Sequence, residues 1–222
     1  TYYDKLIFVD YDGTITTQDT VLKSINLFMD PKEAYKTVTK LHEGEITLSE
    51  AVHGCFDGLD ANLLDQMVDN IKDVNIREGF EEFLFRMDEL QIPVVLLSAG
   101  FEPLIMSKIG HLKHSFLDMY YGRIDASGET LKIDSDFDDG IELINKQEVM
   151  NLYKSDIKII IGSRGVYLRP AVASVTLIGS SPLARGLPLL SSSLVMTPVD
   201  HPRSRGVYGL FVFEGVVGEV YC

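Results

Sequence analysis

The chain has 222 residues, of which 45% are hydrophobic and 24% charged, so it can bury the core of one domain, with or without an insertion. Its formal net charge of −13 argues against nucleic acid as a partner, because contacts along a phosphate backbone need a basic surface. The sequence contains no apolar run that could span a membrane and no signal-peptide pattern at its start, so we expect a cytoplasmic protein with no membrane partner.

The first predicted element is a buried strand over residues 6–9 that runs directly into Asp10 and Asp12. A continuous apolar run is typical of a parallel strand covered on both faces, and Gly13 is a natural place for the chain to turn. Ligands of open α/β sheets bind outside the carboxyl ends of the strands. Two carboxylates placed there repel each other unless a cation or a shared proton intervenes, so the pattern predicts a metal site.

Four amphipathic stretches follow the first strand. They cover residues 21–29, 32–41, 48–56 and 63–71, and the spacing of their apolar residues predicts short helices. Asp30 followed by Pro31 marks a helix boundary, and Thr47 with Glu50 three residues later forms a capping-box pattern. The sequence therefore predicts a helical insertion over residues 16–74.

Helix and strand patterns alternate after residue 75. Helices are expected over residues 78–90, 101–109 and 142–153, and strands over residues 91–97, 119–124 and 157–161. The acidic run 134–139 lacks the spacing of a calcium-binding loop and is expected to be a solvated loop. Buried strands separated by helices predict an α/β fold, a Rossmann-like doubly wound parallel sheet built from residues 1–15 and 75–162.

The composition changes beyond residue 162. Residues 163–222 carry five basic and three acidic residues, against 15 and 30 in residues 1–162, and a strand over Val207–Phe213 is the one element that their pattern suggests. We hypothesise that this atypical tail is translated out of frame or comes from an alternatively spliced exon. The alternative is a divergent tail that packs on the sheet edge. The two cysteines, Cys55 and Cys222, form no zinc pattern and are expected to be free thiols.

The segment Asp-Tyr-Asp-Gly-Thr-Ile-Thr that begins at Asp10 resembles the first motif of the haloacid dehalogenase-like (HAD) phosphatases, and the later motifs follow in order. The resemblance implies that Asp10 attacks phosphorus to form an aspartyl-phosphate. It implies that Asp12 protonates the leaving alcohol and then activates water. It also implies that the Asp10 carboxylate and the Asp12 main-chain carbonyl hold Mg²⁺.

Two further positions match this superfamily. Ser98, after an apolar strand, matches the second motif, in which a hydroxyl and the next backbone amides bind phosphoryl oxygens, so Ala99 and Gly100 are implied as substrate-binding residues. Lys146 matches the third motif, a cation that offsets charge at the nucleophile and the phosphate. Lys154 also lies near this position and is the alternative.

The helical insertion stands where the phosphoserine-phosphatase-like branch of the superfamily carries its cap. The first motif with Asp19 after it, and the later Leu-Ser-Ala-Gly segment, are similar to phosphatases that act on phosphoserine or on the enol-phosphate intermediate of methionine salvage. The residues leave this choice open. The resemblance implies a small phosphorylated metabolite as substrate, with Thr14 and Asp19 among the residues that bind it.

The fourth motif of the superfamily is missing. Its first acid follows a glycine after the last core strand and completes the Mg²⁺ site, whereas this chain has Gly162, Ser163 and Arg164 there. Loss of a carboxylate should weaken a site for a hard cation. The alternative to an active phosphatase is therefore an impaired member that binds a phosphorylated ligand or a partner protein. A phosphotransferase that uses the same aspartyl-phosphate is a second alternative.

Overall fold

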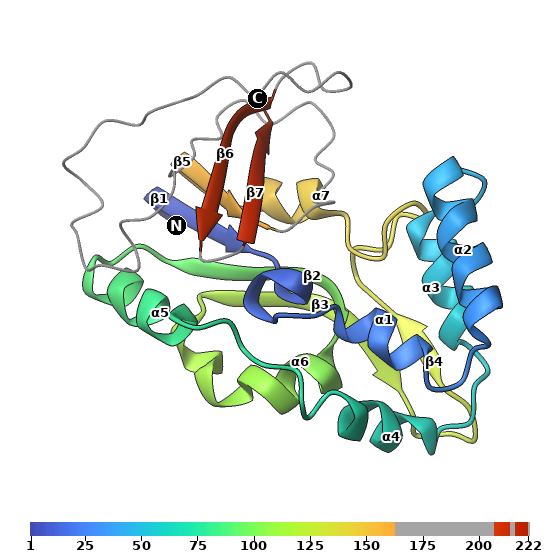
Figure 1. Cartoon of the computed structure of the whole chain (residues 1–222). Helices are drawn as coiled ribbons and strands as arrows, with labels where there is room; N and C mark the ends of the chain where they lie inside the picture. The colour runs from blue at the N-terminus through green and yellow to red at the C-terminus, as the bar shows by residue number, and fades with distance from the viewer. Residues whose placement is uncertain (163–206, 214–215, 222) are drawn as a thin grey trace.

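A five-stranded sheet forms the centre of the computed structural model, with the strand order β4-β3-β2-β1-β5 (Figure 1). The structure describes residues 1–162 in full and residues 207–213 and 216–221 as backbone. Along the sheet, the strands are Lys132–Asp134, Asp118–Asp125, Val94–Phe101, Tyr2–Val9 and Lys154–Ile161. β1 pairs in parallel with β2 and β5, β2 pairs in parallel with β3, and the short β4 is antiparallel to β3. The predicted Rossmann-like α/β fold is confirmed.

β1 is buried on both faces, as its apolar run predicts. Ile7 and Val9 pack against α5 (Phe80–Glu89) and α6 (Glu102–Ile109), while Leu6 and Phe8 pack on the side of α7 (Lys146–Asn151). Successive side chains of a strand point to opposite faces, so four consecutive apolar residues serve two core layers. This burial fixes the end of β1, where the first carboxylate follows.

α7 is shorter than the helix expected over residues 142–153. Its start is set by Asn145, whose side chain accepts a hydrogen bond from the Glu148 amide at 3.0 Å. Immediately before it, the Asp139 carboxylate accepts hydrogen bonds from the amides of Ile141 and Glu142 at 2.9 and 2.8 Å. Such local side-chain bonds hold the backbone in a turn and compete with a helix.

The four helices predicted between the first two strands are present: α1 (Thr20–Ile25), α2 (Pro31–Glu43), α3 (Leu48–Phe56) and α4 (Leu63–Asn70). The caps are the predicted ones, because Asp30 precedes α2 and the Thr47–Glu50 capping box begins α3. Figure 1 shows α2 and α3 together beside the sheet, at the end from which α1 leaves β1. The division into a core and a cap over residues 16–74 stays a prediction.

The tail contributes a second, two-stranded antiparallel sheet of β6 (Val207–Phe213) and β7 (Val216–Tyr221). The predicted strand over β6 is confirmed, and the hypothesis on the origin of residues 163–222 falls largely outside the described residues. Cys55 is a buried free thiol, as expected, whereas Cys222 is not among the described residues. Within the described part of the chain, no helix is long and apolar enough to cross a membrane.

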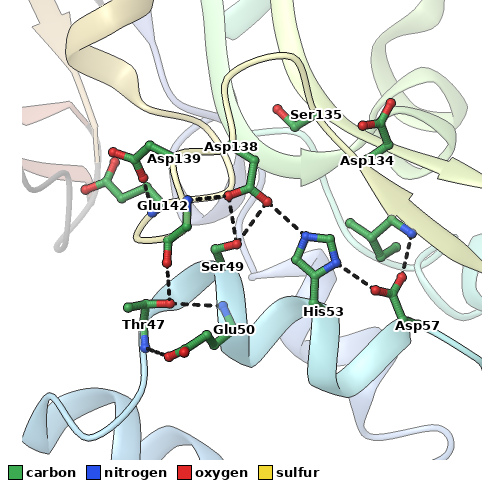
Figure 2. A network of polar contacts seen from close by, with 12 residues as sticks. Thr47, Ser49, Glu50, His53, Asp57, Asp134, Ser135, Asp138, Asp139 and Glu142 are labelled. Carbon is green, nitrogen blue, oxygen red and sulfur yellow. Dashed lines mark hydrogen bonds and ion pairs between the residues drawn. The ribbon is translucent and has the colours of Figure 1, made fainter.

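A polar network joins α3 to the loop that leads into α7 (Figure 2). His53 lies between two carboxylates, with its Nδ1 2.7 Å from Asp57 and its Nε2 2.9 Å from Asp138. Ser49 donates to the same Asp138 at 2.8 Å, and the Thr47 hydroxyl donates to the Gly140 carbonyl at 2.8 Å. Part of the predicted solvated loop 134–139 is therefore engaged with the helical insertion.

The network predicts a pH-dependent stability. Both ring nitrogens of His53 face acceptors, so the imidazole binds best as the cation, and the hydrogen bonds to Asp57 and then to Asp138 raise the pKa of His53 above its ordinary 6.5. In the unfolded chain His53 lacks these two partners, so its pKa returns to the ordinary 6.5. The stabilisation from His53 is therefore complete below pH 6.5 and disappears as the pH rises through the raised folded-state pKa.

We expect His53→Gln to lower the unfolding midpoint at about pH 5.5 and to change it little at about pH 8.5, as measured by thermal or urea denaturation. His42→Gln is the matched control, because it removes an exposed histidine from the neighbouring α2. A His53→Gln difference that stays constant over this pH range would contradict the prediction.

Candidate active site

A cavity of about 380 Å³ opens where β1 and β2 end and α7 begins. Its polar end brings together six of the residues selected from the sequence: Asp10, Asp12, Asp19, Ser98, Gly100 and Lys146. Ala99 also borders it, and helices α1, α2 and α3 supply the remaining wall. These residues come from separate elements of the chain and lie near the carboxyl ends of parallel strands, where ligands of open α/β sheets bind.

Asp10 follows β1 directly and faces the lysine of the third motif. Its Oδ1 lies 3.3 Å from Lys146 Nζ and accepts a hydrogen bond from the Tyr11 amide at 3.0 Å. Both side chains of this ion pair are mostly buried, with 16% and 14% exposed. The alternative, Lys154, is paired with Tyr2 at the opposite end of β1. Of the two candidate lysines, Lys146 is thus the one placed beside Asp10.

Asp12 is held by the first turn of α1. Its Oδ1 accepts hydrogen bonds from the Thr20 amide at 2.6 Å and from the Thr20 hydroxyl at 2.7 Å. Burial, with a contribution from the negative charge of Asp19, nevertheless raises the pKa of Asp12 from 3.8 to about 7. A carboxyl group with this pKa can both give and take a proton near neutral pH.

Asp19 caps α1 and adds a third carboxylate to the cavity. Its Oδ1 accepts from the Leu22 amide at 2.7 Å. Burial raises the pKa of Asp19, and the charge of Asp10 adds to this effect against the opposing hydrogen bond from Leu22. The cavity therefore combines three acids with one lysine among its described lining residues, which gives its polar end an excess of negative charge.

The second motif lies in a bulge of β2, which corrects our expectation that the strand ends at residue 97. The chain advances four positions from Leu97 to Phe101 while β3 advances two, from Tyr120 to Gly122. β2 then resumes, and α6 begins only at Glu102. The backbone at Ser98 and Gly100 thus bulges into the cavity, because extra residues in one strand leave the ladder locally unpaired.

Gly100 comes unusually close to Asp12. A Cβ atom built at Gly100 would lie 2.7 Å from Asp12 Oδ2 and 3.1 Å from Ser98 Oγ. The Gly100 amide donates to that Ser98 oxygen at 2.9 Å. Glycine is therefore required here by the close approach of a carboxylate, and the Ser98 hydroxyl is fixed in place by the backbone.

Thr14 is the predicted site residue that the structure does not bring to the cavity. It is buried in the turn after Asp12, and its carbonyl accepts from Arg77 Nε at 2.9 Å. Arg77 also donates to the Gly13 carbonyl at 2.9 Å, so it holds the turn in which Gly13 adopts a φ of 70°. Arg77 and Thr20 were missed by the sequence reasoning, because neither belongs to a local pattern that shows its partner.

The polar end of the cavity supplies some of the oxygen donors that a hard cation needs. The Asp10 carboxylate and the Asp12 main-chain carbonyl are the two donors that the family resemblance implies. Among the described residues, no group of three or more His, Cys, Asp or Glu side chains is arranged to hold a metal ion. Ser163, at the position of the missing acid, lies outside the described residues. The described donor set is thus compatible with Mg²⁺ and incomplete.

Comparison with known proteins gives no matching family model. A 2-hydroxy-3-keto-5-methylthiopentenyl-1-phosphate phosphatase of Lysinibacillus sphaericus is 32% identical over 133 residues, which cover 58% of this chain and 56% of that protein. A Microcystis aeruginosa protein of the same name is 25% identical over 162 residues, 71% of this chain and 76% of the relative. The chain thus spans little more than half the length of the Lysinibacillus relative.

Solved structures show the same fold. A phosphoserine phosphatase from T. onnurineus superposes with a TM-score of 0.54 at 17% identity, over 72% of this chain and 78% of that one. A HAD family hydrolase from Salmonella enterica gives a TM-score of 0.53 at 14% identity, over 72% and 57% of the two chains. The chain is thus similar in sequence to phosphatases named for a methylthiopentenyl phosphate, and it has the same fold as a phosphoserine phosphatase and a HAD family hydrolase.

Proposed function

We propose that the chain is a phosphatase that hydrolyses a small-molecule phosphate monoester through an aspartyl-phosphate. The observation that carries the proposal is the meeting of Asp10, Asp12, Ser98 and Lys146 around one cavity, although they lie on separate elements of the chain. A phosphate bound there would face a nucleophilic carboxylate, a hydroxyl and an ammonium group together. The relatives named as phosphatases support the same reaction class.

In the first step, an Asp10 carboxylate oxygen attacks phosphorus and the bond to the ester oxygen breaks. The leaving alkoxide takes the proton of the Asp12 carboxyl group, whose raised pKa keeps part of it protonated near pH 7. The products are the free alcohol and an acyl phosphate on Asp10. The Lys146 ammonium, already 3.3 Å from Asp10, offsets the negative charge that gathers during the attack.

In the second step, water attacks the phosphorus of the aspartyl-phosphate. The Asp12 carboxylate, now deprotonated, removes a proton from this water, and the bond between phosphorus and Asp10 breaks. Inorganic phosphate leaves and both aspartates return to their starting states. The Thr20 hydrogen bonds to Oδ1 hold Asp12 in one orientation for both proton transfers, with Oδ2 on the side of Gly100.

Mg²⁺ is the proposed cofactor, with the Asp10 carboxylate and the Asp12 main-chain carbonyl as its protein donors. When bound, it would neutralise charge between the phosphate and the carboxylates. The excess of acids over lysine at the polar end supports a cation there.

Two phosphorylated compounds are candidate substrates. The relatives' names make a phosphorylated methylthio keto compound one candidate for this chain. Phosphoserine, the other candidate from the motifs, carries a carboxylate and an ammonium group beyond the phosphate. The two candidates differ in charge at the end that would face the helical wall.

Asp10→Asn should abolish phosphate release from p-nitrophenyl phosphate in the presence of Mg²⁺, because an amide oxygen is too weak a nucleophile to form the intermediate. Asp4→Asn is the matched control, since it removes an exposed aspartate from the same strand, β1. Phosphate release that survives Asp10→Asn would contradict the assigned nucleophile. No release from either the parent chain or Ser163→Asp would favour the binding-protein alternative.

Gly100→Ala should lower kcat by roughly 10- to 100-fold with little loss of stability, because the new methyl group would displace the Asp12 carboxylate from its position. Gly54→Ala on α3 serves as the control, since a Cβ at Gly54 meets nothing within 4 Å. Steady-state kinetics and thermal unfolding of both variants separate the two effects. Equal kcat values for Gly100→Ala and the parent chain would contradict the prediction that turnover depends on the position of the Asp12 carboxylate.

A further inference from the structure

The turn that carries Asp12 is irregular. Residues Tyr11–Ile15 form a single wide turn, which is closed by a hydrogen bond from the Thr16 amide to the Tyr11 carbonyl at 3.1 Å. Within it, Asp12 has extended backbone angles and Gly13 a left-handed φ of 70°. A turn with this mixture of angles lacks the repeating bonds of a helix, so contacts from other segments decide how firmly it is held.

Arg77 supplies such contacts from the segment that leads into α5. Its Nε donates to the Thr14 carbonyl at 2.9 Å, and its Nη2 donates to the Gly13 carbonyl at 2.9 Å and to the Thr16 carbonyl at 3.4 Å. Nε and Nη2 form one edge of the planar guanidinium, which therefore holds these carbonyls in a fixed arrangement. A lysine ammonium has no rigid edge and cannot copy this geometry.

The backbone of Arg77 is attached to the same turn. Its amide donates to the Ile15 carbonyl at 2.7 Å. Beside this bond, Thr16 and Ile76 form an antiparallel bridge. The main chain and the side chain of Arg77 therefore hold the turn at adjacent positions.

These contacts bear on the direction of the Asp12 carbonyl, one of the two donors proposed for Mg²⁺. The Gly13 amide donates to the Thr16 hydroxyl oxygen at 3.2 Å, and Thr16 is fully buried. The described peptide bonds are all trans, and the N–H and C=O of a trans peptide point in opposite directions. The Asp12 carbonyl shares a peptide unit with the Gly13 amide, so it points away from the Thr16 hydroxyl. A shift of Thr16 would turn this carbonyl.

Arg77 itself does not border the cavity. It lines neither the charged end nor the apolar wall, which is formed by side chains of α1, α2 and α3 such as Leu22, Val38 and Val52. An influence of Arg77 on the proposed reaction must therefore pass through the turn.

We propose, on the basis of the proposed phosphatase function, that Arg77 is a positioning residue for Asp12. By binding the Gly13, Thr14 and Thr16 carbonyls, its guanidinium fixes the peptide planes of the turn, and with them the direction of the Asp12 carbonyl and carboxylate. Loss of the guanidinium keeps every group that would touch the phosphate and lets Asp12 move. Turnover should therefore fall, while the affinity for a phosphate ester changes little.

Arg77→Met and Arg77→Lys test this role in the full chain with p-nitrophenyl phosphate and Mg²⁺, at a temperature at which each variant is folded by circular dichroism. We expect kcat to fall by roughly 10- to 100-fold in Arg77→Met and by at least about threefold in Arg77→Lys, with KM within about threefold of the parent value in both. Arg86→Met is the matched control, because Arg86 lies on α5 and pairs with Glu89 at the surface.

The control should keep the parent's kcat. Parent-level kcat in either folded Arg77 variant, or a loss that appears in KM alone, would overturn the inference. Arg77→Lys decides the question if Arg77→Met does not fold.

Hydrogen exchange separates this inference from the proposed function, because it needs no turnover. Without substrate or metal, the peptide that covers residues 11–18 should exchange at least about tenfold faster in Arg77→Met than in the parent, while peptides from β2 and α7 keep their rates. Arg77→Lys should be intermediate, and Arg86→Met should match the parent. If the parent releases no phosphate, the proposed function has failed, and faster exchange over 11–18 still supports the hold of Arg77 on the turn. Unchanged exchange there overturns the inference, whatever the activity.

Discussion

The mutual repulsion of three carboxylates at the end of β1 is the constraint on which the rest of the site depends. Asp10, Asp12 and Asp19 border one cavity, and burial raises the pKa of Asp12 to about 7. Lys146 offsets the charge of Asp10, and the Thr20 amide and hydroxyl hold Asp12. These stabilising groups come from α7 and α1, two helices that lie far apart in the sequence. The site can therefore form only when distant segments are assembled together.

The contacts that assemble those segments lie outside the cavity. The α3 helix is joined to the loop before α7 by the His53 and Ser49 bonds to Asp138, and the same loop ends at Asn145, the cap that begins α7 at Lys146 (Figure 2). The helix that supplies part of the apolar wall is thus connected through a short segment to the lysine at the charged end. The acidic loop before α7 therefore helps to hold α3 and α7 together, a role that its composition alone does not indicate.

The sequence was sufficient where local chemistry decides the structure. The Thr47–Glu50 capping box has both of its partners within one turn, and the unbroken apolar run before Asp10 indicates burial on both faces by itself, so both were predicted correctly. The bulge of β2 was not, because the run of apolar residues stops at Ser98 although the strand resumes beyond it. Arg77 was missed for a related reason. Its partners are carbonyls more than 60 positions earlier in the chain, and no residue pattern indicates a carbonyl as a partner.

The two ends of the cavity are physically linked through water. Burial is the largest cause of the raised pKa of Asp12, and the apolar wall helps to exclude water from the space that Asp12 faces. Any ligand that fills the cavity would displace water from the same space and strengthen this effect. The protonation of Asp12 therefore depends on how much water reaches the polar end past the apolar wall.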